Sequence, residues 1–215
     1  QLQKGAYLFL YVSHTILIPS NQKLQINYGG IIMANYTNLK KLATLGVLAA
    51  CSVVLMLAVR IPFPPAPFLE YDPADIPILI GTFLFGPVAG FALTVVVSLL
   101  QGLTVSAGSG WIGIVMHVAA TGCFALLAGF IYKKHHDRKH AYIALVCGTV
   151  VQTAIMALMN LWLTPIFMGT PTDVVLQMLV PIIIPFNLLK AGVNALVTAL
   201  IYKRIHKVLQ KINLL

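Results

Sequence analysis

Charged side chains, and acidic ones above all, are scarce in this sequence. Only 9% of its 215 residues are charged and just 5 are Asp or Glu, whereas 59% are hydrophobic. A soluble domain carries about 25% charged residues, which cover its water-facing surface. The apolar runs from Leu42 onward also reach the roughly 20 residues that cross a bilayer. The composition therefore predicts an integral membrane protein.

The sequence also lacks the motifs of several membrane enzymes and pumps. It has no Walker lysine motif, so the chain cannot power transport by itself, and it has no HExxH zinc pair. No pair of acids lies within the apolar segments, as a hydrolase or a proton-coupled pump would need. Cys51, Cys123 and Cys147 lie in apolar segments, where they indicate packing and not a disulfide framework. His117 has no Cys or carboxylate near it in the sequence, which indicates a packing histidine and no metal site.

The net charge of +9 is concentrated in short basic clusters at the ends of apolar segments. This is the pattern of membrane topology, and it argues against nucleic acid as a partner. With six spans, the clusters before the first segment, between the fourth and fifth, and after the sixth all fall on one side. The positive-inside rule identifies that side as the cytoplasm. Four of the five acidic residues fall on the other side, and they are Glu70, Asp72, Asp75 and Asp173.

The predicted fold class is therefore all-α, a polytopic bundle of six transmembrane helices in the cell membrane with both termini in the cytoplasm. The expected helices are Leu39–Arg60, Ile76–Phe85, Val88–Val105, Trp111–Tyr132, Ala141–Phe167 and Val174–Lys203. The second helix is short, because about ten residues cover about 15 Å of a hydrocarbon core about 30 Å thick. It is either an incomplete span or it merges with its neighbour near Gly86–Pro87.

Residues 1–32 differ in composition from the rest of the chain. Their apolar patch of about a dozen residues is too short to span a bilayer, and no clear cleavage site follows it. Gly29 and Gly30 can be encoded by a ribosome-binding sequence two codons before Met33. We expect residues 1–32 to be an atypical leader, translated from upstream sequence, and residues 33–215 to form the membrane domain.

The first long connection, residues 61–77, reads IPFPPAPFLEYDPADIP, and its six prolines rule out a regular helix. One interpretation is a rigid extracellular connector. The other is an extracellular lid, whose prolines lower the entropy cost of ordering it over a ligand. The aromatic residues among the prolines favour the lid.

Lys190 lies in the middle of an apolar segment, where a Lys costs about 2.5–3.5 kcal/mol. Snorkelling is a weak explanation, because a long apolar stretch follows before the basic end. Asn187 and Asn194 lie three residues before it and four after it, on the same helix face. A polar stripe inside a bilayer faces protein or a cavity. We expect Lys190 to meet a ligand, an interior partner, or a lid carboxylate such as Glu70 or Asp72, and Asn187 to contact the ligand.

Helix five carries a similar polar pair, Gln152 and Asn160, two turns apart on one face. For Gln152 and Asn194, simple cross-linking of helices is an equal alternative to ligand contact, worth about 0.6 kcal/mol each. Pro181 and Pro185 precede the polar stripe of helix six, where they should loosen the backbone and open room for a ligand.

The SAGSG turn between helices three and four is flanked by Gln101 and Trp111. These two residues could line the mouth of a binding site. The alternative is that Gln101 only joins helices and that Trp111 is an anchor at the membrane interface.

Two stretches carry a resemblance to a known family, and they read FLEYDPADIPILIGTFLFGPVAGF and PFNLLKAGVNAL. They are similar to motifs of the riboflavin-specific substrate-binding subunits, or S components, of energy-coupling factor transporters. The similarity covers about residues 36–207. It implies six helices, with riboflavin bound near the extracellular side under the first loop. It also implies partners, namely a transmembrane coupling subunit and two cytoplasmic ATPases.

Members of that family contact the flavin through an Asn on helix five and an Asn and a Lys on the last helix. The flavin pyrimidine edge offers one N–H donor and several acceptors, and Asn serves both kinds whereas Lys serves only acceptors. The flat ring would suit Phe68, Tyr71 or Trp162. The expected ligand-binding residues are Asn160, Asn187, Lys190, Phe68, Glu70 and Tyr71.

The first helix of the family usually carries an Ala-x-x-x-Ala motif that contacts the coupling subunit. This chain departs from it, with Gly46-x-x-x-Ala50 as the nearest match. Ala43, Gly46 and Ala50 together form the expected coupling face.

Three alternatives remain open from the residues alone. The first is an S component for another vitamin, such as thiamine or biotin, because polar spacing does not distinguish these ligands from riboflavin. The second is a membrane enzyme that uses His117 or Lys190, and the third is a structural membrane protein without a ligand.

Overall fold

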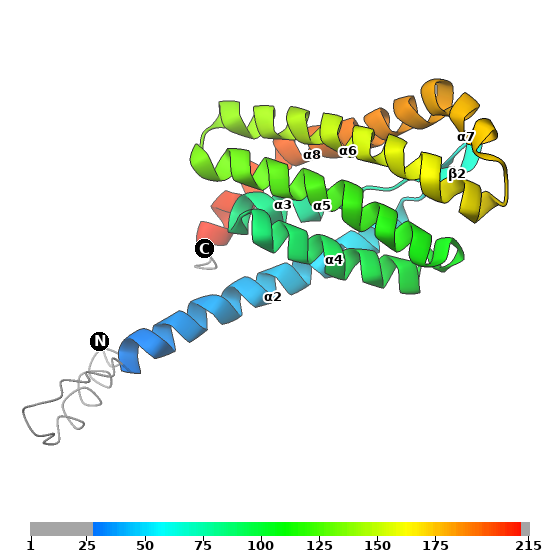
Figure 1. Ribbon diagram of the computed structural model, residues 1–215. Coiled ribbons are helices and arrows are strands. Elements are labelled where there is room, and N and C mark those ends of the chain that lie inside the picture. Colours follow the sequence, from blue (N-terminus) through cyan, green and yellow to red (C-terminus); the bar gives the residue numbers. More distant parts are fainter. Residues whose placement is uncertain (1–27, 212–215) are drawn as a thin grey trace, which may run out of the picture. The chain divides into compact units, whose positions relative to one another are not determined.

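The computed structural model describes residues 28–211 of the chain. The chain divides into two compact units, residues 1–37 and 38–215, and the second unit contains the helix bundle. Of the predicted leader, residues 1–27 lie outside the described part, whereas residues 28–32 already belong to the first helix. The elements in chain order are α2 (Tyr28–Ala58), β1 (Ile61–Phe63), β2 (Ala66–Tyr71), α3 (Asp75–Phe85), α4 (Pro87–Leu103), the 3₁₀ turn η1 (Ala107–Ser109), α5 (Gly110–Lys134), α6 (Arg138–Met168), α7 (Thr172–Met178), the π-helical segment η2 (Leu179–Ile183) and α8 (Ile184–Lys211) (Figure 1).

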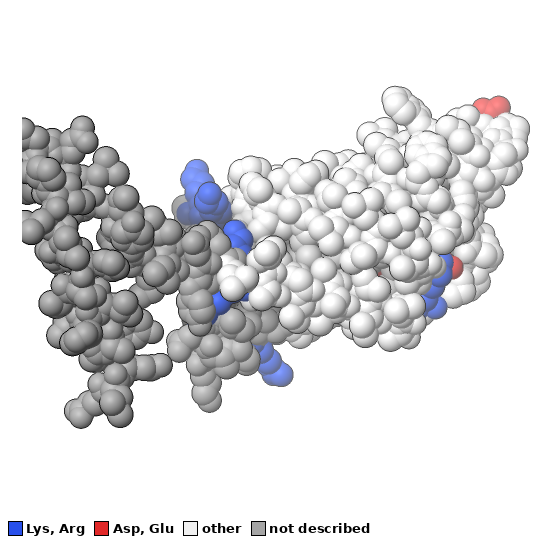
Figure 2. Space-filling model, turned by 90° about the horizontal axis from the view of Figure 1, so that it is seen from below, with Lys and Arg blue, Asp and Glu red and all other residues white. Residues whose placement is uncertain are grey.

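Each of the six predicted segments is helical. Within residues 28–211, four stretches are long and apolar enough to cross a membrane, namely Leu39–Ala58, Ala107–Lys134, Arg138–Met168 and Thr172–Tyr202. The helices α3 and α4 are apolar but shorter. Figure 2 shows most of the visible Lys and Arg side chains at one end of the second unit, and acidic side chains together with a smaller basic patch at the other end, with a largely uncharged surface between the two ends. That distribution suits a bundle whose sides face lipid.

The short second segment ends where the sequence indicated, at Gly86. The backbone of Gly86 has a φ of +90°, a conformation that only glycine adopts without strain. Pro87 then opens α4, where the missing N–H of proline costs no helical hydrogen bond. Ile78, Leu79 and Ile80 on α3 are at most 1% exposed. The helix is therefore a core element that the longer helices surround, which explains why it is apolar on all sides.

The predicted lid contains a two-stranded antiparallel sheet, so the all-α description needs a correction. Ile61 pairs with Tyr71 and Pro62 with Glu70. With only two strands, each strand is an edge, and edges tolerate proline because its missing N–H can face away from the partner. Beneath the hairpin lies a hydrophobic cluster shared with α7, η2 and α8, in which the rings of Phe63 and Phe186 are 5.2 Å apart.

The last helical stretch, predicted as Val174–Lys203, contains a turn of π-helix at Leu179–Ile183. Pro181 lies within this turn and Pro185 is the second residue after it, as expected from prolines that remove backbone donors and crowd the preceding turn. The loosening predicted from these two prolines is confirmed. It lies immediately before the polar residues of α8.

Candidate functional site

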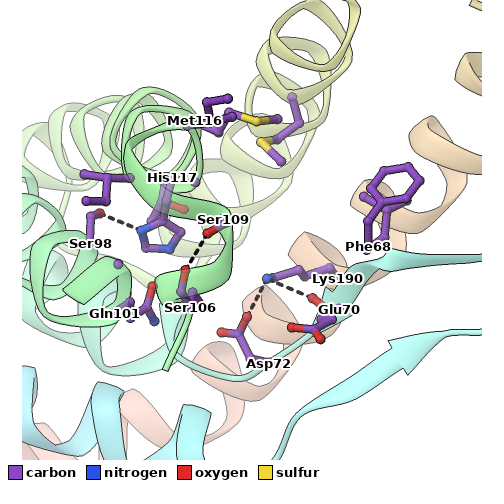
Figure 3. A pocket seen from close by; sticks show the side chains of 18 of the residues that line it. Phe68, Glu70, Asp72, Ser98, Gln101, Ser106, Ser109, Met116, His117 and Lys190 are labelled. Atoms are coloured by element: carbon purple, nitrogen blue, oxygen red, sulfur yellow. Dashed lines mark hydrogen bonds and ion pairs between the residues drawn. The ribbon is translucent and has the colours of Figure 1, made fainter. Parts of the chain in front are cut away.

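A cavity of about 410 Å³ lies under the hairpin, between α4, α5, α6 and α8 (Figure 3). Its walls include residues 112–121 of α5, 152–167 of α6 and 186–190 of α8. The first stretch belongs to the beginning of α5 and the second to the end of α6, so both are far from the basic turn that joins these two helices. The cavity therefore lies in the half of the bundle opposite the basic end, on the side of the lid.

Lys190 reaches from α8 to the hairpin. Its Nζ donates to Oδ2 of Asp72 at 2.6 Å and to the backbone oxygen of Glu70 at 3.2 Å (Figure 3). The side chains of Lys190 and Asp72 are 17% and 8% exposed, so the pair is largely shielded from solvent. The expectation of a lid carboxylate as its partner is confirmed for Asp72. An ammonium has three hydrogens, which leaves one for an acceptor in the cavity.

Asn187 and Asn160 line the same cavity and are 4% and 1% exposed. In each, Nδ2 donates to the backbone oxygen four residues earlier, at 2.8 Å for Asn187 and 2.7 Å for Asn160. These bonds fix which amide atom is nitrogen, because a carbonyl only accepts. Each amide keeps one N–H and at least one oxygen lone pair, so each can both donate and accept.

The aromatic residues expected at the site lie in three different environments. Phe68 lines the main cavity, and Trp162 is 79% exposed, which turns its ring away from the bundle interior. Tyr71 borders a second, almost wholly apolar cavity of about 320 Å³ between the hairpin and α8. Its hydroxyl donates to Oδ1 of Asn194 at 3.2 Å. Burial and the nearby Asp72 carboxylate raise the pKa of Tyr71, so the hydroxyl keeps its proton.

A second polar cluster surrounds Asp75 at the start of α3 and reaches the cavity through His117, Thr121 and Gln152, which line it. Its carboxylate is 1% exposed and accepts from Thr121 Oγ1 at 3.2 Å and Gln152 Nε2 at 3.2 Å. Nε2 of His117 lies 3.0 Å from Oδ1. The expectation that His117 has no carboxylate nearby was wrong, because α3 and α5 bring together residues far apart in the sequence. Asn194 also belongs to this cluster and donates to the backbone oxygen of Asp72 at 3.1 Å.

His117 links α4 to the Asp75 cluster. Ser98 Oγ donates to the backbone oxygen of Thr94 at 2.6 Å, and Nδ1 of His117 lies 2.7 Å from the same hydroxyl oxygen. On the other side of the ring, Nε2 faces the Asp75 carboxylate. His117 therefore bridges the hydroxyl of Ser98 and the carboxylate of Asp75.

Arg60 connects the two sides of the cavity mouth. Its Nε pairs with Glu70 on the hairpin, and its Nη1 donates at 2.7 Å to the backbone oxygen of Val105, just after α4. Glu70, which we expected to bind ligand, thus lines the cavity while already paired with a cation. Each acidic group around the cavity has a basic partner, and the site as a whole is close to neutral.

Within the part of the chain that the structure describes, no group of three His, Cys, Asp or Glu could hold a metal ion. The polar groups of the cavity are amides, hydroxyls, the imidazole of His117 and two ion pairs, Lys190 with Asp72 and Arg60 with Glu70, set among apolar and aromatic side chains. Such a lining is typical of a pocket for a neutral organic molecule with several hydrogen-bonding groups.

The chain is similar to proteins named as transporters. It is 35% identical over 180 residues to the riboflavin transporter RibU of Staphylococcus aureus (strain TCH60), across 80% of this chain and 94% of the relative. It is 32% identical over 172 residues to the riboflavin transporter FmnP of Bacillus subtilis (strain 168), across 76% of this chain and 90% of the relative.

Its fold is similar to a solved structure described as the S component of a bacterial ECF transporter, with a TM-score of 0.69 and 33% identity over 80% of this chain and 98% of that one. The relatives are transporters and not enzymes, and the protein is a multi-pass protein of the bacterial plasma membrane. Residues 40–202 match the family described as ECF transporter, substrate-specific component, to which this chain belongs.

Proposed function

We propose that the chain is the high-affinity riboflavin-binding S component of an energy-coupling factor importer, and that it captures riboflavin on the extracellular side. The observation that carries this proposal is the convergence of Asn160, Asn187 and Lys190 on one cavity. The two relatives named above, which this chain covers almost completely, are riboflavin transporters and support the same ligand.

The unused hydrogen-bond donors and acceptors of these three residues suit the pyrimidine edge of a flavin. Asn187 and Asn160 each offer a donor and an acceptor, and Lys190 offers one donor. A flavin edge presents one N–H between two carbonyl oxygens. The protein must therefore supply one acceptor with a donor on each side of it. Phe68 and Phe186 supply apolar surface for the ring in the same cavity.

The topology follows from the same proposal. Six spans, with α3 and α4 as the shorter ones, place the α5–α6 turn in the cytoplasm together with both termini. Lys133, Lys134, Arg138 and Lys139 then obey the positive-inside rule. The cavity faces the extracellular side. Uptake needs partners, a transmembrane coupling subunit and two cytoplasmic ATPases, because the chain has no nucleotide-binding motif of its own.

Replacement of Asn187 by alanine is the direct test of the proposed site. The wild-type protein in detergent should quench flavin fluorescence on titration, and Asn187→Ala should weaken riboflavin binding up to about tenfold, because a neutral hydrogen bond is worth about 0.5–1.5 kcal/mol. Asn194→Ala is the matched control, since Asn194 is equally buried but does not line the cavity. Thiamine and biotin should fail to compete. Competition by either would favour another vitamin as the ligand.

We further propose that Ala43, Gly46 and Ala50 of α2 contact the coupling subunit. All three are exposed, whereas Leu48 and Ser52 on the opposite side of the helix are buried. A Cβ added at Gly46 would have no atom within 4 Å. Small residues let helices approach closely in lipid, where close packing drives association.

The double variant Gly46→Leu and Ala50→Leu should reduce co-purification of the coupling subunit and riboflavin uptake, with binding of riboflavin nearly unchanged. The added side chains push the partner helix away but point away from the cavity. Cys51→Leu, which adds bulk on another exposed flank of α2, is the control and should assemble normally. Normal assembly of the double variant would place the coupling surface elsewhere.

A further inference from the structure

The wall of the cavity formed by α4, η1 and α5 differs in chemistry from the wall formed by α6 and α8. It presents hydroxyl groups, the amide of Gln101 and the imidazole of His117, whereas the other wall carries the ammonium of Lys190 with the amides of Gln152, Asn160 and Asn187 and the hydroxyl of Thr164. Figure 3 shows Ser98, Gln101, Ser106 and Ser109 on one side of the cavity, with Lys190, Asp72 and Glu70 on the other. A ligand that contacts both walls must therefore have two chemically different parts.

Gln101 is the most informative residue of the hydroxyl-rich wall. It lies in the last turn of α4 and is only 5% exposed. Its backbone oxygen accepts from the N–H groups of Thr104 and Ser106, at 3.2 and 2.8 Å, which fixes the residue at the end of the helix. Its side-chain Nε2 is buried and has no hydrogen-bond partner among the described residues. A buried amide hydrogen without a partner is unfavourable, so this group indicates a missing acceptor.

The hydroxyls beside Gln101 lack hydrogen-bond donors from a ligand, whereas Gln101 lacks an acceptor. Ser109 Oγ donates to the backbone oxygen of Ser106 at 2.7 Å, and Ser98 Oγ donates to the backbone oxygen of Thr94 at 2.6 Å. The hydrogen of each hydroxyl is thus used within the protein, and the oxygen still has lone pairs. The wall therefore offers a donor at Gln101 and acceptors at the hydroxyls. A chain of hydroxyl groups, each of which both donates and accepts, complements this set.

We propose that this wall binds the ribityl chain of riboflavin and that Gln101 is the residue that specifies it. This inference rests on the proposed function. It assigns the flavin ring edge to Asn187 and Lys190 and the acyclic polyol to Gln101 and the neighbouring hydroxyls. The reverse orientation would place the ring edge at Gln101.

Lumiflavin separates these possibilities, because it has the same ring system with a methyl group in place of the ribityl chain. Both flavins are titrated by fluorescence quenching against wild type, Gln101→Met and Gln101→Glu. Methionine keeps the approximate shape of glutamine without hydrogen-bonding groups, and glutamate replaces the amide donor with an acceptor. Both variants should weaken riboflavin binding about two- to tenfold, the value of one neutral hydrogen bond, and should leave lumiflavin affinity unchanged or higher.

Retained lumiflavin binding also shows that each variant is folded. Gln177→Met, an exposed glutamine on α7, is the control for the substitution itself and should bind both flavins normally. Asn187→Ala should weaken both flavins equally. An equal loss of both flavins in the Gln101 variants, complete loss included, overturns the inference, as does unchanged riboflavin affinity. Wild-type protein that binds neither flavin would overturn the proposed function itself.

Discussion

Replacing Lys190 by methionine is expected to weaken riboflavin binding roughly ten- to a hundredfold, because a hydrogen bond from a charged group is worth about 1.5–3 kcal/mol. The same change should lower the thermal midpoint of the protein in detergent. It leaves the Asp72 carboxylate, which is 8% exposed, without the ammonium that lies 2.6 Å from it. Loss of one partner of a buried pair costs about 3–5 kcal/mol.

The double variant Lys190→Met with Asp72→Asn separates the two roles of the lysine. Asparagine removes the uncompensated charge, so the thermal midpoint should return most of the way to the wild-type value. Riboflavin affinity should remain low, since the ligand still lacks its cationic donor. Lys133→Met removes an equal charge from the exposed basic turn and should change neither property.

Two other outcomes would alter the assignment of Lys190. If the double variant regains affinity, Lys190 acts only by holding the hairpin against α8 and does not contact riboflavin. If Lys190→Met alone binds riboflavin as tightly as wild type, the ligand lies elsewhere in the bundle and the Lys190–Asp72 pair only fastens the hairpin.

Features set by the cost of burying charge could be predicted from the sequence. A lysine within an apolar segment requires an interior partner, and Asp72 is one of the two carboxylates that we expected. The apolar segments and the break at Gly86 could also be predicted. Lipid restricts which residue types a span can contain, and backbone geometry restricts which residues a tight turn can contain, at each position separately. These arguments need no knowledge of which helices are neighbours.

Features that depend on which surfaces meet could not be predicted. Asp75 and His117 are 42 residues apart, and only the packing of α3 against α5 brings them within 3.0 Å. The hairpin was also missed, because the prolines exclude a helix but give no strand register. Once the strand is known, the placement of Glu70 in the main cavity and Tyr71 in the second follows, since successive side chains of a strand point to opposite faces.

The His117–Asp75 pair should be a major source of stability. His117→Leu removes a hydrogen-bond partner from the carboxylate of Asp75, which is 1% exposed, and should destabilise the protein by about 1–3 kcal/mol. The thermal midpoint in detergent, without ligand, is the measurement. The chain offers a matched control in His140 and Asp137, which form a similar pair at 2.6 Å on the exposed basic turn. Exposed pairs are screened by water, so His140→Leu should change the midpoint little.

A double-mutant cycle tests whether the two residues are energetically coupled. His117→Gln and Asp75→Asn should each lower the midpoint, but the double variant should be more stable than the sum of the single losses, because two neutral amides no longer leave a charge unpaired in the interior. Additive losses would mean that His117 and Asp75 are not energetically coupled. In that event the Asp75 carboxylate is stabilised by Thr121 and Gln152, and removing either of those donors, not His117, should produce the larger fall in the midpoint.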